Sequence, residues 1–322
     1  MLSEKDNFLK ALGGEIPEYV PRYDIMWGIS PSCLNGERVN GVGKDIYGVN
    51  YTNEGSAVPG ALPEPGNFIL QDITKWRDVI KFPDLSDVNW ELMAQRDLAK
   101  RNPNLPLGGS TGGGIFQRLM AFMGFNEGLV ACITDPDEVK ELCHYLIDNA
   151  LSVADKYLYY YKPDYISGGD DIAHERQPFV SLEMFRDIFA PEWARYIKFF
   201  KDEGLLAVHH NCGHFEAFLE DVVKMGYNAW EPVQNSNDAV GLKAKYGKSF
   251  MLIVVMSSAP LLAHNPGITK ADVYNVVKGH LDKLAPGGGF GFMGSVMGSD
   301  PVSQERNKWL GEVFEELRVQ YY

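Results

Sequence analysis

The sequence predicts one α/β domain of the (β/α)8 barrel class, and three observations support this prediction. The chain has 322 residues, of which 45% are hydrophobic and 12% aromatic, so it can bury one large core without disulfides or a second domain. After residue 100, short apolar runs bounded by Gly or Pro alternate with longer stretches of helical period, as in βα units of a parallel sheet. These units recur every ~20–40 residues to the end of the chain, which suits a barrel of about 250–350 residues.

The individual elements follow from the same patterns. Strands are predicted over residues 164–167, 205–209, 229–232, 250–256 and 289–294. Helices are predicted over 182–200, 214–225 and 269–284. Ser181 and Thr269 stand at the positions that a helix N-cap prefers, and Pro286-Gly287 follows the last of these helices.

The first hundred residues are less regular and rich in Gly and Pro, as in the run Pro59-Gly60-Ala61-Leu62-Pro63-Glu64-Pro65-Gly66. Long irregular segments in compact enzymes usually form a lid or part of a binding surface. We therefore interpret residues 1–100 as an N-terminal elaboration that covers the mouth of the barrel, within a single domain that spans 1–322.

Charge and composition exclude several classes of function. The chain carries 43 acidic against 30 basic residues, a formal charge of -13, whereas a nucleic-acid surface needs clustered Lys and Arg. No stretch approaches the ~20 apolar residues that span a bilayer, and the acidic start is unlike a signal peptide. The four scattered cysteines do not form a disulfide framework. We expect a cytoplasmic protein with reduced thiols, no membrane contact and no nucleic-acid partner.

The strongest motif is Val208-His209-His210-Asn211-Cys212-Gly213-His214, at the end of a predicted strand. Side chains at the carboxyl ends of barrel strands converge on one pocket. An imidazole and a thiolate two residues apart can therefore share one site, and both are good zinc ligands. Lone His and Cys residues are often structural, so the spacing alone leaves both interpretations open.

Other polar residues are predicted to join this site. Asp170, Asp171 and His174 follow the strand that ends near Ser167, and Glu231 lies near the end of the strand after the His-Cys motif. Asp170 or Asp171 could instead cap the following turn. Tyr23, Met26 and Trp27 belong to an early aromatic segment, which is either core or the lining of a pocket for a small, apolar, possibly aromatic substrate.

Two glycine-rich stretches do not indicate nucleotide binding. Residues 108–114 read GGSTGGG and lack the Lys-Ser/Thr of a P-loop. Residues 289–294 match GxGxxG, but no further strand follows them, so a dinucleotide-binding half has no room. Close backbone approach or tight packing explains these glycines more simply.

Several stretches, in this order, resemble the uroporphyrinogen decarboxylase superfamily over nearly the whole chain. They are Lys10-Ala11-Leu12-Gly13-Gly14-Glu15-Ile16-Pro17-Glu18-Tyr19-Val20-Pro21, Phe82-Pro83-Asp84, Asp135-Pro136-Asp137-Glu138-Val139, Gly169-Asp170-Asp171 with Ser181-Leu182-Glu183-Met184-Phe185, His210-Asn211-Cys212-Gly213 and Glu231-Pro232-Val233-Gln234. The resemblance implies the barrel fold and a site at the HxCG segment.

Within that superfamily the sequence is more similar to the corrinoid-dependent methyltransferases than to the porphyrin decarboxylases. The decarboxylases carry an N-terminal arginine-rich motif for substrate carboxylates, where this chain reads Pro21-Arg22-Tyr23-Asp24-Ile25-Met26-Trp27 with a single Arg. The methyltransferases hold zinc with the His and Cys of HxC, which His210 and Cys212 match. The thiol methyltransferases add a later Cys, and this chain has none after Cys212. The resemblance therefore implies either a substitute ligand, such as Glu231, Asp171 or His209, or loss of the metal.

These observations predict an enzyme that moves a methyl group between a small methylated compound and the cobalt of a separate corrinoid protein, since the chain lacks the corrinoid-binding DxHxxG motif. We favour O-demethylation of a methyl ether, possibly aromatic. The predicted catalytic residues are Asp171, Glu231 and His210. The predicted zinc ligands are His210, Cys212 and Glu231. The predicted substrate contacts are Tyr23, Met26, Trp27, Asp170 and His174. A metal-free decarboxylase would need cationic residues in the pocket, and a non-catalytic binding module would tolerate alanine at His210, Cys212 and Asp171.

Overall fold

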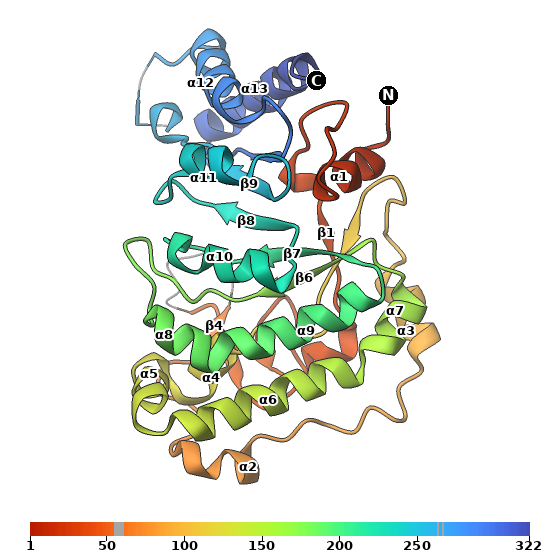
Figure 1. The fold of residues 1–322 in the computed structure, drawn as a ribbon, viewed down its shortest axis with the longest axis vertical. Coiled ribbons are helices and arrows are strands. Elements are labelled where there is room, and N and C mark those ends of the chain that lie inside the picture. Colours follow the sequence, from red (N-terminus) through yellow and green to blue (C-terminus); the bar gives the residue numbers. More distant parts are fainter. Residues whose placement is uncertain (55–60, 263, 266) are drawn as a thin grey trace.

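Parallel strands form the centre of the fold (Figure 1). The computed structural model describes residues 1–54, 61–262, 264–265 and 267–322, and leaves the side chain of Trp27 outside the description. Five parallel strands pair in the order β10-β9-β8-β7-β6, and β1 pairs with β5 in parallel. Their bounds are β1 Trp27–Gly28, β5 Leu107–Gly108, β6 Tyr165–Gly169, β7 Leu206–His210, β8 Ala229–Val233, β9 Met251–Val255 and β10 Phe290–Met293.

Backbone hydrogen bonds continue between the two sheets. On one side, Asp164 N donates to Leu107 O at 2.7 Å and Ser167 N donates to Gly109 O at 2.8 Å, which joins β5 to β6. On the other, Phe292 N donates to Pro21 O at 2.8 Å, which joins β10 to the segment before β1. The predicted α/β barrel class is thereby confirmed.

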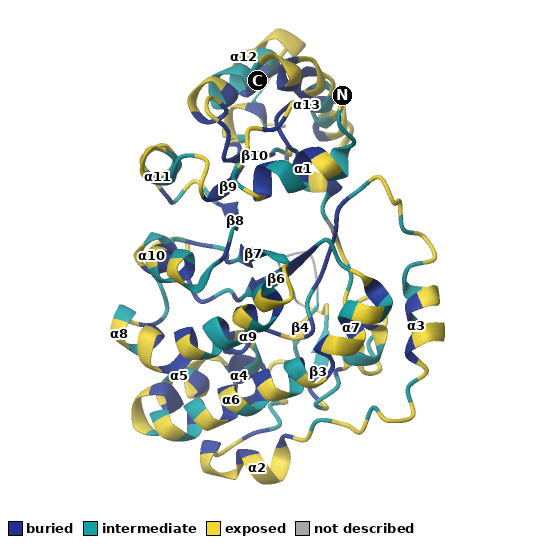
Figure 2. Cartoon of the chain, turned by 45° about the vertical axis from the view of Figure 1, so that its right-hand side comes forward, coloured by how far each residue is buried: buried dark blue, intermediate teal, exposed yellow. Residues whose placement is uncertain are grey.

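Helices surround the strands, and Figure 2 shows buried strands inside a shell whose outer faces are exposed. The larger helices are α1 Glu4–Leu12, α3 Trp90–Asp97, α4 Phe116–Met123, α5 Phe125–Thr134, α6 Pro136–Ser152, α7 Ala154–Tyr161, α9 Ala190–Asp202, α10 Glu216–Met225, α11 Ala239–Tyr246, α12 Lys270–Leu284 and α13 Pro301–Leu317. The short helices α2 and α8 cover Trp76–Val79 and Leu182–Met184. A small antiparallel sheet, β2 Gly43–Lys44, β3 Asn50–Thr52 and β4 Leu62–Pro63, comes from the first hundred residues.

Side chains alternate between two cores because successive residues of a strand face opposite sides. Tyr165, Val208 and Ala229 belong to one cluster, together with Phe8 and Leu12 of α1. The alternate residues of the strands pack outward against the helices in the larger cluster. The α1 helix therefore packs at the amino ends of the strands, and the carboxyl ends lie opposite.

The predicted elements agree with the structure to within about two residues, with one exception. Thr269 caps α12 in a capping box with Asp272, as its position in the sequence indicated. The helix predicted over 182–200 is interrupted by a π-helical turn at Phe185–Phe189 between α8 and α9. Pro191 lies in the first turn of α9 and has no backbone N–H to donate to the preceding turn, which favours this wider turn.

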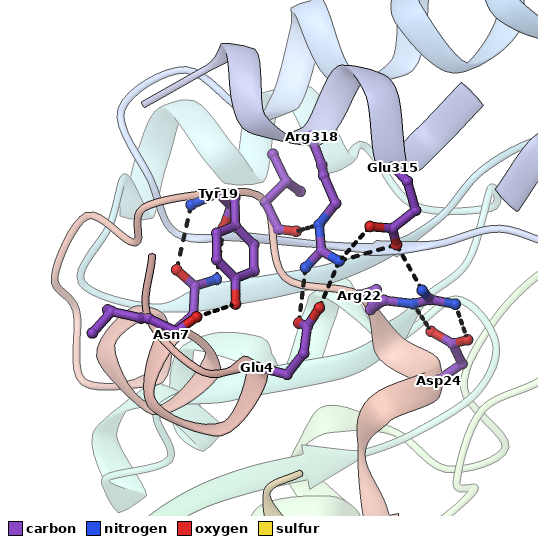
Figure 3. Close-up of polar contacts among 9 residues, drawn as sticks. Glu4, Asn7, Tyr19, Arg22, Asp24, Glu315 and Arg318 are labelled. Atoms are coloured by element: carbon purple, nitrogen blue, oxygen red, sulfur yellow. Dashed lines mark hydrogen bonds and ion pairs between the residues drawn. The ribbon is translucent and has the colours of Figure 1, made fainter. Parts of the chain in front are cut away.

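An ion cluster joins the two ends of the chain (Figure 3). The Arg318 guanidinium, whose side chain is 2% exposed, forms two hydrogen bonds of 2.8 and 2.9 Å with the Glu4 carboxylate. It also contacts Glu315 at 3.1 Å and donates to the Val20 carbonyl at 3.0 Å. Arg22 pairs with Glu315 at 2.7 Å and with Asp24. We call Glu4, Arg22, Asp24, Glu315 and Arg318 the terminal cluster.

Among the described residues, no helix is both long enough and apolar enough to cross a membrane.

Candidate metal and substrate site

The carboxyl ends of three neighbouring strands bring the predicted site residues together. In the register of the sheet, Gly169 of β6 lies beside His210 of β7, which lies beside Glu231 of β8. Asp171 follows β6 by two residues and Cys212 follows β7 by two. Residues in lateral register on parallel strands have side chains on the same face. His210 and Glu231 therefore share the face of the barrel interior.

Asp171, His210 and Cys212 form a compact group of potential ligand atoms. One ligand atom from each lies within 4.8 Å of the others. His210 Nε2 is 3.3 Å from Asp171 Oδ1 and 4.0 Å from Cys212 Sγ. Tetrahedral zinc with bonds of about 2.0–2.3 Å separates its ligand atoms by roughly 3.3–3.8 Å. The donor types and spacing therefore fit a divalent metal, and we call these three residues the ligand triad.

Glu231 lies on the opposite side of the His210 ring from Asp171, and its predicted role as a metal ligand stays a prediction. Its Oε1 lies 2.8 Å from His210 Nδ1, on the side of the imidazole away from the triad. A carboxylate behind a ligating histidine fixes the ring and leaves Nε2 free to bind a metal. Glu231 Oε2 is buried without a hydrogen-bond partner among the described residues.

The two flanking carboxylates determine the charge of the site. Burial disfavours the imidazolium of His210, but hydrogen bonds with Asp171, Cys212 and Glu231 outweigh it and raise the pKa of His210 far above its usual range. Burial likewise opposes ionisation of Asp171, yet its hydrogen bonds with His210 and Cys212 lower the pKa of its carboxyl to about 2. The site is thus built to hold positive charge.

Asp170 is fully buried and links the site to α4. Its Oδ2 accepts the backbone N–H of Gln117 at 3.0 Å, near the start of that helix, and its Oδ1 has no hydrogen-bond partner in the part of the chain that the structure describes. Burial raises the pKa of Asp170 to about 7. The Gln117 side chain in turn donates to Asp171 Oδ2 at 3.0 Å. Asp170 therefore positions Gln117, which in turn holds Asp171. Contact between Asp170 and the substrate remains a prediction.

A cavity of about 820 Å³ opens onto the triad. Asp171 and Cys212 lie in its wall, together with the aromatic rings of Phe116, Phe125 and Phe179. Residues from the first hundred also line it: Arg38, Tyr51, Ala61, Leu62, Pro63 and Phe68. Its volume and apolar wall suit a small-molecule ligand. We call it the aromatic cavity.

The other predicted substrate contacts differ in where they lie. Tyr23 is close to Glu231, and burial together with that carboxylate raises the pKa of Tyr23 to about 12. Met26 packs against the inner core cluster. His174 is exposed, with its ring 6.2 Å from Phe179. The side chain of Trp27 lies outside the described residues. Substrate contact by these four residues stays a prediction.

The expectation that His209 could replace the missing cysteine is wrong. His209 alternates with His210 on β7 and therefore faces outward. Its ring is fully buried among Trp193, Phe215 and Tyr227, with centroid distances of 4.8–5.2 Å. It cannot reach the triad from this side of the sheet.

Sequence reasoning missed Gln117 and Gln234 as supports of the site. Gln234 Oε1 accepts the backbone N–H of Gly213 at 2.6 Å, and Cys212 N donates to Asp171 Oδ1 at 2.8 Å. Gln234 belongs to the segment that begins at Glu231, so its neighbourhood was a signal. No sequence signal pointed to Gln117, because its role depends on how α4 packs beside β6.

Comparisons with known proteins agree with this architecture. The family model for uroporphyrinogen decarboxylase (URO-D) matches residues 56–289. A solved structure, a methyltransferase from Methanosarcina mazei, superposes with a TM-score of 0.62 at 17% sequence identity, covering 98% of this chain and 99% of that one. No curated protein matches the sequence.

Proposed function

Because the chain belongs to the uroporphyrinogen decarboxylase family, we propose that it is a methyltransferase that moves a methyl group between a small methylated compound and the cobalt of a separate corrinoid protein. A structural neighbour over the full length is itself a methyltransferase, which supports the class. The resemblance of the HxCG segment to the corrinoid-dependent branch supports the partner.

The ligand triad is the observation that carries this proposal. A carboxylate, an imidazole and a thiol converge within 4.8 Å at the carboxyl ends of the strands, where barrel enzymes place their chemistry. We propose that Asp171 replaces the further cysteine of the thiol methyltransferases, which has no counterpart after Cys212 in this chain. We therefore assign Asp171, His210 and Cys212 as the residues that would hold zinc.

Zinc bound there would act as a Lewis acid toward the heteroatom that carries the methyl group. The protein's own residues prepare this site. Glu231 would keep one proton of His210 on Nδ1, 2.8 Å away, so that a metal ion could displace the other proton and bind Nε2. Gln117 and the Cys212 backbone N–H donate to the two oxygens of Asp171 and fix its orientation.

We favour a methyl ether as the methyl donor. The aromatic cavity beside the triad supports an apolar, ring-shaped substrate, because Phe116 and Phe179 stack with centroids 6.0 Å apart and Phe125 meets Phe179 edge-on at 4.8 Å. A single Cys in the triad also leaves the site less rich in thiolate than a thiol methyltransferase requires.

An anoxic absorption assay tests the proposal. Reduced cobalamin or a corrinoid protein is incubated with the zinc-loaded enzyme and a panel of methyl ethers, methylamines and methylthiols. We expect conversion of Co(I) to methyl-Co(III) with the ethers. Turnover of methylamines or thiols alone would remove the ether assignment, and no conversion with any donor, even with the cognate corrinoid protein, would refute methyl transfer.

A metal-free decarboxylase is the second candidate, because Arg38 and Arg118 line the aromatic cavity and cations are what a decarboxylase needs to bind its substrate. Methyl transfer remains favoured because a polycarboxylate needs more cations than this cavity holds. Release of carbon dioxide from a carboxylated substrate without any corrinoid would reverse this preference.

A further inference from the structure

Two neighbouring residues of α4 reach two different parts of the molecule. Gln117 Nε2 donates to Asp171 Oδ2 of the ligand triad at 3.0 Å. Arg118 pairs with Asp45, which directly follows β2 and whose side chain is fully buried. The hydrogen-bonded backbone of a helix holds adjacent residues rigidly together. The first turns of α4 therefore join the triad to the small sheet of β2, β3 and β4, which we call the N-terminal sheet.

Asp45 is the point at which the N-terminal sheet is fixed to the barrel. Its Oδ1 accepts the backbone N–H groups of Tyr47 and Val49 at 2.9 Å each, in the turn that joins β2 to β3. Arg118 pairs with Oδ2 of the same carboxylate, and its guanidinium lies 5.2 Å from the centroid of the Tyr47 ring. Phe122, one turn further along α4, meets that ring edge-on at 5.5 Å. The helix thus holds the turn by an ion pair and by aromatic contacts.

The N-terminal sheet is held here as one wall of the aromatic cavity. Tyr51 of β3 and Leu62 and Pro63 of β4 line the cavity on this side. Asp171 and Cys212 of the triad line it as well. A ligating carboxylate keeps its orientation only while the groups that donate to it keep theirs. The contact that places the sheet therefore acts on the same helix that orients Asp171.

The charges of the ion pair do not explain a role at the triad. A metal ion held by Asp171, His210 and Cys212 would be repelled by Arg118 and attracted by Asp45. Together the two partners carry no net charge, so their fields at the triad oppose each other. What the pair supplies to the site is a fixed position of α4.

We infer that Arg118 is a positioning residue of the metal centre. Through Asp45 it holds the N-terminal sheet against α4, and through its neighbour Gln117 it fixes the carboxylate of Asp171. The effect on the metal rests on the proposed zinc site. The attachment of the sheet by Arg118, and its effect on the donors around Asp171, do not.

Zinc affinity, measured by competition with a chelator, tests this inference. Arg118→Met and Asp45→Asn should each weaken zinc binding by about 3–10-fold, because either change loosens α4. A purely electrostatic role predicts opposite signs, with tighter binding in Arg118→Met and weaker binding in Asp45→Asn. Tighter binding in Arg118→Met, or unchanged binding in both variants, would overturn the inference.

Two further variants protect this test against simple misfolding. Asp45→Asn keeps an acceptor oxygen for the turn, so it remains informative if the buried carboxylate left by Arg118→Met prevents folding. Arg118→Lys keeps the charge and loses the planar guanidinium, and its zinc affinity should lie between those of the wild type and Arg118→Met. Affinity in Arg118→Lys below that of Arg118→Met would contradict the positioning role.

A double-mutant cycle tests the route through Gln117. Gln117→Met removes the donor to Asp171 and should weaken zinc binding by about 10-fold. If Arg118 acts through Gln117, adding Arg118→Met to this variant should change the affinity by less than about twofold. Full additivity of the two losses would show that Arg118 acts by another route.

Arg318→Met is the matched control. Arg318 is also a buried arginine that ties the N-terminal part of the chain to the barrel. It is not among the described residues that line the aromatic cavity. Its loss should lower stability and leave zinc affinity unchanged. Equal loss of zinc affinity in Arg318→Met would mean that general destabilisation explains the result, and would overturn the role of Arg118.

Amide hydrogen exchange in the metal-free protein separates this inference from the zinc site itself. The Cys212 N–H donates to Asp171 Oδ1 at 2.8 Å, and its exchange should be about 3–10-fold faster in Arg118→Met. Faster exchange in a protein that binds no zinc would refute the metal centre and retain the positioning role. Zinc binding with unchanged exchange and unchanged affinity in Arg118→Met would retain the metal centre and refute the positioning role.

Discussion

The terminal cluster and the ligand triad both bring charged side chains together, and they are built in opposite ways. In the terminal cluster, all three nitrogens of the Arg318 guanidinium donate hydrogen bonds, to Glu4, Glu315 and the Val20 carbonyl. Around the triad, carboxylates outnumber the cation. Two of their oxygens, on Glu231 and Asp170, are buried without a partner within the described ranges.

This difference separates a structural ion cluster from a binding site. A buried cation whose donors are satisfied ties segments together, here Glu4 near the start of the chain to Arg318 near its end. A site that gathers acidic groups around one imidazole, with unused oxygen atoms, is arranged for a further cation. The same residue types thus serve stability at one end of the molecule and binding at the other.

The largest expected effect is on stability, in the terminal cluster. Arg318→Ala should lower the free energy of unfolding by about 3 kcal/mol, because it leaves the buried Val20 carbonyl unpaired and removes the partner of Glu4. Arg22→Ala, at a side chain that is 31% exposed, should cost about 1 kcal/mol or less. Urea unfolding measures both, and zinc content should stay unchanged. A loss of zinc in Arg318→Ala with intact folding would contradict the separation of the two regions.

The next effect is on metal binding, at the triad. Cys212→Ala should weaken zinc binding by more than about 100-fold and should abolish methyl transfer. Removing a zinc ligand should lower zinc affinity more than removing a carboxylate that only supports a ligand. Cys33→Ala is the control, because Cys33 is a free thiol that lies outside the triad. Elemental analysis and the cobalt assay give the readouts. Full activity in Cys212→Ala would contradict the metal centre and favour a metal-free enzyme.

A smaller effect is expected behind the triad. Glu231→Gln keeps the volume but weakens the contact with His210 Nδ1, and should lower zinc affinity by about 10–100-fold with the fold intact. Glu315→Gln, the corresponding change in the terminal cluster, should reduce stability and leave zinc affinity unchanged. Competition with a chelator measures both affinities, and equal zinc affinity in the two variants would remove the supporting role of Glu231.

Much of this arrangement could be predicted from the sequence, and the limits have physical causes. The strand positions followed from apolar runs, and His210 and Cys212 from their place at a strand end. The direction of each side chain was harder, because a shift of one residue along a strand reverses the face: His209 and His210 could be told apart only once β7 was placed. Gln117 and Arg38 approach the site from separate elements, and no local pattern announces such long-range contacts.

The smallest effect concerns pH, near the terminal cluster. His280 of α12 contacts Phe290 and Phe292, and burial lowers its pKa to about 4. The unfolded chain therefore binds this proton first as pH falls. The buried neutral His280 makes its full contribution to the free energy of unfolding above about pH 6.5, and this contribution is lost toward pH 4. We expect the free energy of unfolding to fall by about 1–2 kcal/mol between pH 7 and pH 5 for this reason. His280→Leu should flatten this part of the unfolding free energy against pH, and an unchanged profile would contradict the assignment.

X-ray absorption at the zinc edge tests the central claim, that Asp171, His210 and Cys212 form a metal centre, most directly. For the zinc-loaded wild-type protein, we predict one sulfur ligand at about 2.3 Å and nitrogen or oxygen ligands at about 2.0–2.1 Å. The sulfur contribution should be absent in Cys212→Ala. A spectrum without sulfur, or one that is identical in the two proteins, would contradict the account and place any bound zinc elsewhere.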